Sequence, residues 1–191
     1  MELKERLVRF RSFWIFPLLA IVLVYATLRG EPQRQVRDLF WLLPLGVLTW
    51  SLLEYGLHRF VFHDRFNVRN PRLREIINAS HLTHHAAPRD ADKLLVRPSY
   101  ALVISGLLFG ILSLGFGRLS DAAGLIAGIW AGFLYYEAVH YRVHLRLSDS
   151  CLIARQRRAH FYHHFINSER CFGVTSPLWD YVFRTQLPRQ P

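Results

Sequence analysis

Four long apolar runs, separated by basic stretches, constrain the fold of this chain more than any other feature. They cover roughly residues 13–28, 39–57, 100–116 and 122–139. Each run is near the ~20 residues that a helix needs to cross a bilayer core, at the short end of that range. We therefore expect an all-α integral membrane protein with four transmembrane helices. The alternative is a soluble protein in which these runs form buried core helices.

The positions of the basic residues indicate the orientation of these spans. With the N-terminus in the cytoplasm, 20 of the 24 Lys and Arg residues fall in residues 1–12, in the 58–98 loop or after residue 140. Only Arg29, Arg34, Arg37 and Arg118 fall outside. This asymmetry predicts cytoplasmic termini and a cytoplasmic 58–98 loop. The net charge of +10 then follows membrane topology, so we expect no nucleic-acid partner. A signal peptide cleaved near Ala26 is the alternative, and it would leave three spans.

No boundary divides the chain, so we expect a single domain over residues 1–191. Cys151 and Cys171 both fall on the expected cytoplasmic side, where thiols stay reduced. Their spacing is not that of a CxxC metal site. Neither a disulfide framework nor a cysteine-based metal site is therefore expected.

All ten histidines fall in four short motifs. They are His58 and His63 in HRFVFH, His81, His84 and His85 in HLTHH, His140 and His144 in HYRVH, and His160, His163 and His164 in HFYHH. Helical residues at i, i+3 and i+4 share a face, so each HxxHH is expected to aim three imidazoles at one point. His58 and His63 lie about 140° apart on an ideal helix, which fits a bend where the second span ends. Each motif lies at or beyond the cytoplasmic end of a span, so the four could converge.

This grouping favours metal binding over the other roles of histidine. A lone histidine is usually a satisfied core residue, a pH sensor needs no repeated HxxHH, and chelating tracts are contiguous. Zinc uses about four ligands, so ten histidines indicate two metal ions. Imidazole suits zinc, copper, iron and nickel alike, which leaves the metal open at this point.

Two acidic residues lie one helical turn before a histidine motif, each within an apolar run. They are Glu54, before His58, and Glu137, before His140. A carboxylate there could accept a hydrogen bond from a metal-bound imidazole and orient it. Alternatively, each glutamate could reach the headgroup region. Asp64, Asp149 and Asp180 are expected to be loop or capping residues.

The ordered motifs resemble the fatty acid hydroxylase and sterol desaturase superfamily, and most closely the membrane fatty acid 2-hydroxylases. The resemblance covers residues 53–185 and includes Glu54-Tyr55, Tyr136-Glu137 and the tail FGVTSPLWDYVF at 172–183. It implies four transmembrane helices, a cytoplasmic helical cap and two iron ions held by the ten histidines. It further implies O2-dependent hydroxylation of a lipid C–H bond, most of all on a fatty acyl chain. Zinc could replace iron in purified protein. The tail is expected either to close the cap by packing or to line the substrate path.

The resemblance leaves the reductant and some rival functions open. Many relatives carry a fused cytochrome b5 domain, for which this sequence has no spare histidine. The expected electron donor is therefore a separate ferredoxin, or cytochrome b5 with a reductase, attracted by the basic surface. Topology and anionic lipid also explain that charge. Rivals are a carotenoid ring hydroxylase, a sterol-modifying oxidase or desaturase, and a metal transporter or store with ligands at the bilayer midplane.

Overall fold

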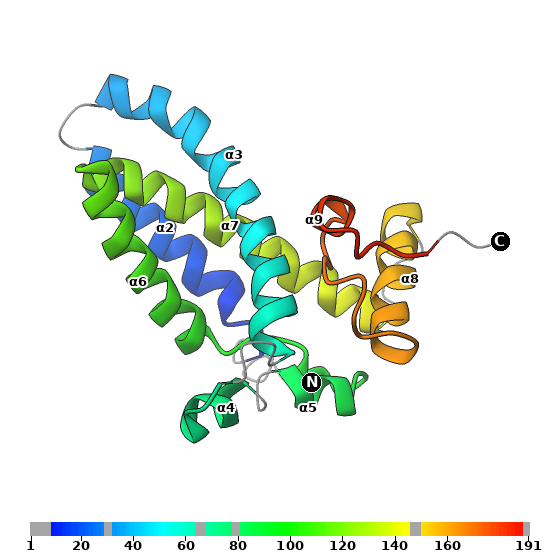
Figure 1. Cartoon of the computed structure of the whole chain (residues 1–191). Helices are drawn as coiled ribbons and strands as arrows, with labels where there is room; N and C mark the ends of the chain where they lie inside the picture. Colours follow the sequence, from blue (N-terminus) through cyan, green and yellow to red (C-terminus); the bar gives the residue numbers. More distant parts are fainter. Residues whose placement is uncertain (1–8, 29–31, 64–67, 78–80, 146–149, 189–191) are drawn as a thin grey trace. The chain divides into compact units, whose positions relative to one another are not determined.

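The computed structural model describes residues 9–28, 32–63, 68–77, 81–145 and 150–188 (Figure 1). Every regular element among these residues is helical, which confirms the predicted all-α class. The elements are α2 (Ser12–Leu28), α3 (Pro32–Gly56), the π-helix η1 (Leu57–Phe62), α4 (Pro71–Ile77), α5 (Thr83–Ala86), the 3-10 helix η3 (Ala91–Lys93), α6 (Pro98–Phe116), α7 (Leu119–Leu145), α8 (Cys151–Phe165) and α9 (Leu178–Val182). They form two compact units, one from Met1–Trp50 and Val96–Leu134, the other from Ser51–Leu95 and Tyr135–Pro191.

Three helical stretches of the described chain are long and apolar enough to cross a membrane. They are Val36–Phe62, Ala91–Phe116 and Leu119–Leu145, and they match the last three of the four predicted runs. The first run forms α2, an apolar helix of 17 residues. At ~1.5 Å per residue α2 is about 25 Å long, somewhat less than the ~30 Å hydrocarbon core. Three spans are thus supported, and a membrane crossing by α2 stays a prediction.

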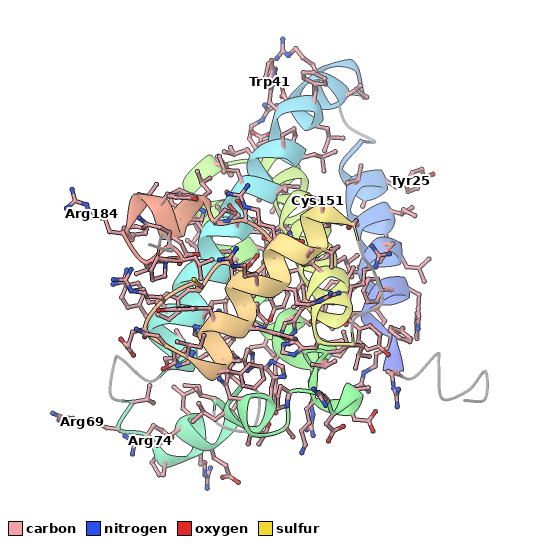
Figure 2. The ribbon with its side chains drawn as sticks, turned by 90° about the vertical axis from the view of Figure 1, so that its right-hand side faces the viewer. Tyr25, Trp41, Arg69, Arg74, Cys151 and Arg184 are labelled. Carbon is pink, nitrogen blue, oxygen red and sulfur yellow. The ribbon has the colours of Figure 1, made fainter. Side chains whose placement is uncertain are left out.

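The first unit exposes large apolar side chains along α3 and α6. Phe40 and Trp41 on α3 and Leu107 and Leu114 on α6 are all more than 60% exposed. Figure 2 shows Tyr25 and Trp41 projecting outward from their helices. Soluble proteins rarely expose apolar surface of this extent, whereas a bilayer accepts it. These faces therefore support membrane embedding.

The first part of α7 packs against three other helices of this unit. Its Trp130 ring lies 5.4 Å from that of Phe16 on α2, and Trp130 Nε1 donates a 2.8 Å hydrogen bond to Ser105 Oγ on α6. Its Phe133 ring lies 5.2 Å from that of Trp50 on α3. Accordingly, 72% of the apolar window in Leu119–Leu145 is buried, against 6% for the other two spans.

Glycines allow α3 and α7 to approach at backbone distance. A Cβ added to Gly46 would meet the Leu125 carbonyl oxygen and lie 2.7 Å from Gly128 Cα. A Cβ added to Gly128 would meet the Leu43 carbonyl oxygen and lie 2.9 Å from Gly46 Cα. Small residues at helix contacts are a common means of packing in membranes, where helices gain no hydrophobic drive from association.

We expect Gly128→Ala to destabilise the protein by about 1–3 kcal/mol, because the added methyl group forces the two backbones apart. Thermal unfolding in detergent measures the effect. Gly110→Ala on α6 is the matched control, since nothing lies within 4 Å of its added Cβ. The control should be neutral or slightly stabilising, as alanine favours helix over glycine. Equal melting temperatures for the two variants would contradict the close contact.

In the second unit, a small apolar core joins the end of α7 to α8. Val139, Val143, Ile153 and Val174 are buried together, with Tyr136 and Phe161 packed against them. Helix α8 begins at Ser150, whose Oγ accepts a hydrogen bond from Ile153 N. A serine cap of this kind satisfies one of the free amides of the first turn. The packing leaves the histidines of both helices in one compact unit.

Candidate metal centre

A change of helix type at the end of α3 brings the first two histidines together. α3 leads directly into the π-helical turn η1, and His58 lies within it while His63 caps its end. A π-helix bonds residues five apart, so residues at that spacing lie about one turn apart. The rings of His58 and His63 are 5.3 Å apart. The expected departure from α-helical geometry is therefore a π-helical turn.

The two HxxHH motifs divide their histidines in the same way. Ring centroids of the first and last histidine are 4.5 Å apart in both motifs, His81 with His85 and His160 with His164. The middle histidine lies 5.9–6.1 Å from the other two of its motif. In HFYHH, which is α-helical throughout, position i+4 lies ~40° from i at ~100° per residue, whereas i+3 lies ~60° to the other side. The three imidazoles of a motif thus point to two places, where we expected one.

As a result, the ten histidines form two groups of five, each able to hold a metal ion. Within each group the ligand atoms all lie within 4.8 Å of one another. The first group is His58, His63, His81, His85 and His163, and the second is His84, His140, His144, His160 and His164. The middle histidine of each motif joins the group formed by the other half of the sequence. His84 lies with the later histidines, and His163 lies with the earlier ones. Each group therefore needs residues from both halves.

The ring nitrogens that face one another are Nε2 atoms. In the first group, His63 Nε2 lies 3.0 Å from His163 Nε2 and 3.4 Å from His81 Nε2. In the second group, four such pairs lie 2.8–3.2 Å apart. Ligands ~2.1 Å from one metal ion and at 90° to each other are ~3.0 Å apart. The spacing suits a shared cation.

Backbone carbonyls select the tautomer of three of these histidines. The Nδ1 atoms of His58, His163 and His140 lie 2.6, 2.8 and 3.1 Å from the carbonyl oxygens of Phe172, Arg170 and Leu94 respectively. A carbonyl oxygen only accepts, so each Nδ1 carries the proton and donates. The corresponding Nε2 then presents a lone pair, as a metal ligand must.

Burial keeps the imidazoles neutral. It lowers the pKa of His163 to about 3 and that of His85 to about 4. Burial, reinforced by neighbouring imidazoles, also lowers the pKa of His81, His84, His160 and His164. Moreover, Nε2 of His58 and His85 is buried with no hydrogen-bond partner among the described residues. Buried nitrogens with free lone pairs are costly unless a cation binds them, so the donor set fits two metal ions.

The sequence model of the fatty acid hydroxylase family matches residues 43–185, which is most of the chain. The chain belongs to the fatty acid hydroxylase family. It is 33% identical over 150 residues to the fatty acid 2-hydroxylase of Macaca fascicularis, covering 77% of this chain and 40% of that protein. It is 30% identical over 174 residues to the dihydroceramide fatty acyl 2-hydroxylase FAH2 of Arabidopsis thaliana, covering 91% and 70%.

A solved structure agrees with this assignment. The structure of full-length scs7p, in which only the hydroxylase domain is visible, superposes with a TM-score of 0.77 at 28% sequence identity. The match covers 92% of this chain and 66% of that one. The predicted resemblance to membrane fatty acid 2-hydroxylases is confirmed. The chain spans about two fifths of the length of some of these relatives. It covers 40% of the Macaca fascicularis protein and 42% of the ceramide very long chain fatty acid hydroxylase scs7 of Schizosaccharomyces pombe.

In this hydroxylase-family chain, the two predicted carboxylates are buried near the histidines. Glu54 is 4% exposed and Glu137 is fully buried. The headgroup alternative requires each side chain to reach outward, and neither side chain does. The hydrogen bonds of Glu54 within the described chain go to Val174 and Thr175. Its predicted action on an imidazole would thus pass through that segment, and the role of Glu137 beside His140 stays a prediction.

A cavity of about 340 Å³ adjoins the second histidine group of this family member. It is lined by Pro88, Arg89, His144, Leu145, Phe161 and Phe165. The lining is mostly apolar, with one guanidinium and one imidazole. The volume is at the lower end of the range seen for ligand sites, and the cavity is half open to its surroundings. Three aspartates were predicted to be loop or capping residues, and two of them, Asp64 and Asp149, lie outside the described residues.

Proposed function

We propose that this chain is a membrane-bound, non-haem di-iron oxygenase that hydroxylates a lipid C–H bond. The proposed substrate is a fatty acyl chain. The observation that carries the proposal is the pair of five-histidine groups, in a chain of the fatty acid hydroxylase family. All ten histidines would be ligands. Bound iron would supply the redox chemistry that activates O2, with zinc as a substitute in purified protein. One oxygen atom enters the C–H bond, and two electrons and two protons reduce the other to water.

The residues of the chain have three tasks in this reaction. The carbonyls of Phe172, Arg170 and Leu94 hold imidazoles in the ligating tautomer. The apolar side chains of the cavity beside His144 would accept part of an acyl chain. Arg89 at the same cavity would hold a hydrogen-bond acceptor of the lipid head. A separate ferredoxin, or cytochrome b5 with a reductase, would supply the electrons.

The position of the histidines in the spans argues for an enzyme over a transporter. His58 falls in the last turns of Val36–Phe62, and His140 and His144 in the last turns of Leu119–Leu145. A transport site would be expected near the bilayer midplane. Ligands at span ends instead suit a reaction on a lipid at the membrane surface.

Lipid analysis tests the proposed reaction. The chain is expressed in a host that lacks it, and a His163→Ala chain is the control. Both cultures are grown under oxygen-18 gas, and their lipids are then extracted. We expect acyl chains heavier by one labelled oxygen atom in the wild-type culture alone. Loss of two hydrogens without added oxygen would indicate desaturation, and labelled carotenoid or sterol would indicate one of the rival substrates. Unchanged lipids alongside a protein that binds metal would refute the proposal.

We also propose that the histidines lie on the cytoplasmic side. Successive spans alternate in direction, so the ends of Val36–Phe62 and Leu119–Leu145 and the start of Ala91–Phe116 would share one side whether or not α2 crosses. With α2 crossing, both termini lie on that side too. The basic 58–98 segment favours the cytoplasm.

The native cysteines provide a test of this orientation. Cys151 is exposed at the first turn of α8 (Figure 2), whereas Cys171 is buried and burial raises its thiol pKa to about 12. Cys171 should therefore react slowly. In sealed spheroplasts, a membrane-impermeant maleimide should label the chain only after lysis. Cys151→Ser should abolish that labelling, and labelling of intact spheroplasts would place α8 outside. A cysteine placed at Asn78, in the 58–98 segment, should likewise be labelled only after lysis, although Asn78 lies outside the described residues.

A further inference from the structure

The segment 170–175, here called the strap, contacts the first histidine group through its backbone. Its carbonyl oxygens at Arg170 and Phe172 accept the Nδ1–H bonds of His163 and His58. Both of these histidines belong to the first group. The corresponding bond in the second group, from His140, goes to Leu94 instead. The strap therefore orients ligands of one group only.

Two carboxylates hold the strap by four consecutive backbone amides. Asp180 accepts hydrogen bonds from Phe172 N at 2.9 Å and from Gly173 N at 2.8 Å. Glu54 accepts from Val174 N at 2.6 Å and from Thr175 N at 2.9 Å. Thr175 Oγ1 adds a third bond to Glu54, at 2.6 Å. Bonds from amides to a buried carboxylate are charge-assisted, so this set fixes the strap firmly.

A chain of hydroxyl groups fixes Asp180 in turn. Thr185 Oγ1 donates to Asp180 Oδ1 at 2.7 Å, and its single proton is used in this bond. Tyr55 OH, 3.0 Å from Thr185 Oγ1, is then the donor to it. Because Tyr55 directly follows Glu54 on α3, the end of one helix supports both carboxylates.

The backbone of the strap is not one that the sequence would adopt unaided. Cys171 has φ of 60°, in the left-handed region that a side chain disfavours. Gly173 has no room for a Cβ, which would meet the Ser176 carbonyl oxygen and lie 2.9 Å from Asp180 Oδ2. Such a conformation persists only where its surroundings impose it, and it often does so at functional sites. Here the surroundings are the two carboxylates and the Thr185 carbonyl oxygen, which accepts a 2.8 Å hydrogen bond from Cys171 N.

We propose that Asp180, acting with Glu54 through the strap, is a positioning residue that sets the metal affinity of the first histidine group and not of the second. The proposal rests on the two-metal site of the proposed function. Loss of a partner that orients a ligand typically costs ~10–100-fold in metal affinity. Removing the Asp180 charge should therefore weaken one of the two ions by that factor. The second group, whose His140 is oriented by Leu94, should keep its affinity.

The test is a chelator titration of the iron-loaded protein in detergent, with metal release measured for Asp180→Asn. In the variant, one ion should leave at ~10–100-fold lower chelator concentration than in the wild type, and the other at an unchanged concentration. Glu75→Gln is the matched control, since it removes an exposed carboxylate on α4. The control should release both ions as the wild type does. A wild-type protein without two ions would refute the two-metal site itself, which is a separate result.

Double variants identify which ion is affected. Asp180→Asn added to His163→Ala should change little, because both act on the first group. Added to His84→Ala, it should weaken the ion that remains. Circular dichroism and melting temperature confirm that each variant is folded. If Asp180→Asn does not fold, Thr175→Val decides, since it removes one bond to Glu54 at nearly constant shape. Equal weakening of both ions in a folded variant, or of neither, would overturn the proposal.

Discussion

Alanine at His84 or at His163 is expected to remove one of two metal ions and to abolish lipid hydroxylation. The two residues lie in different groups, so each change opens a different site. Four imidazoles would remain in the affected group, with a cavity where the fifth had been. Activity should fall to background in both variants, because the proposed O2 chemistry needs both ions.

Elemental analysis and lipid product yield measure these two effects. Arg155→Ala is a suitable control, because Arg155 is exposed on α8, the helix that carries His163. This control should keep two ions. Retention of two ions at wild-type affinity by a folded His84→Ala or His163→Ala protein would show that the changed residue is not a ligand.

The second large effect is expected from Glu137→Gln. The Glu137 side chain is fully buried on α7, one turn before His140. A buried carboxylate is expensive unless positive charge nearby offsets it, and two metal ions held by neutral imidazoles would provide that charge. Glutamine keeps the size and removes the charge. We therefore expect ~10–100-fold lower metal affinity or hydroxylated-lipid yield.

Asp121→Asn is the matched control for this change, since Asp121 lies in the first turn of the same helix, far along the sequence from the histidines. It should retain wild-type iron content and product yield. If Glu137→Gln matched this control and melted at a higher temperature, Glu137 would be a buried charge that merely costs stability.

The sequence predicted which histidines come together better than it predicted how they are arranged. Periodicity and residue type identify each HxxHH. The ~100° step between i+3 and i+4 turns the middle imidazole of a helical motif away from the other two, which the expectation of a single meeting point left out. The convergence of four motifs into two groups depends on tertiary packing, which spacing alone does not report. Likewise, the apolar run at residues 13–28 predicted a helix, which forms, but did not determine whether α2 crosses the membrane.

The strap was beyond sequence reasoning for a different reason. Orientation of His58 and His163 comes from backbone carbonyls, and every residue has one, so no residue type marks the position. Asp180 was predicted to be a loop or capping residue, yet it lies buried in α9 and binds two amides of the strap. The nearest signal in the sequence was Gly173, which the strap requires. The first residue of the 172–183 tail, Phe172, packs against rings of the first histidine group, while the closing of a cap stays a prediction.

The exchange of His84 and His163 between the groups also bears on how the protein matures. Residues 58–85 supply four histidines of the first group and one of the second, while residues 140–164 supply the remaining five. A nascent chain that ends before α8 lacks His163 of the first group and His160 and His164 of the second. If both groups bind metal as proposed, full loading would follow synthesis of the C-terminal part, and each ion would join early and late segments of the polypeptide. Metal binding would in this way be coupled to completion of the fold.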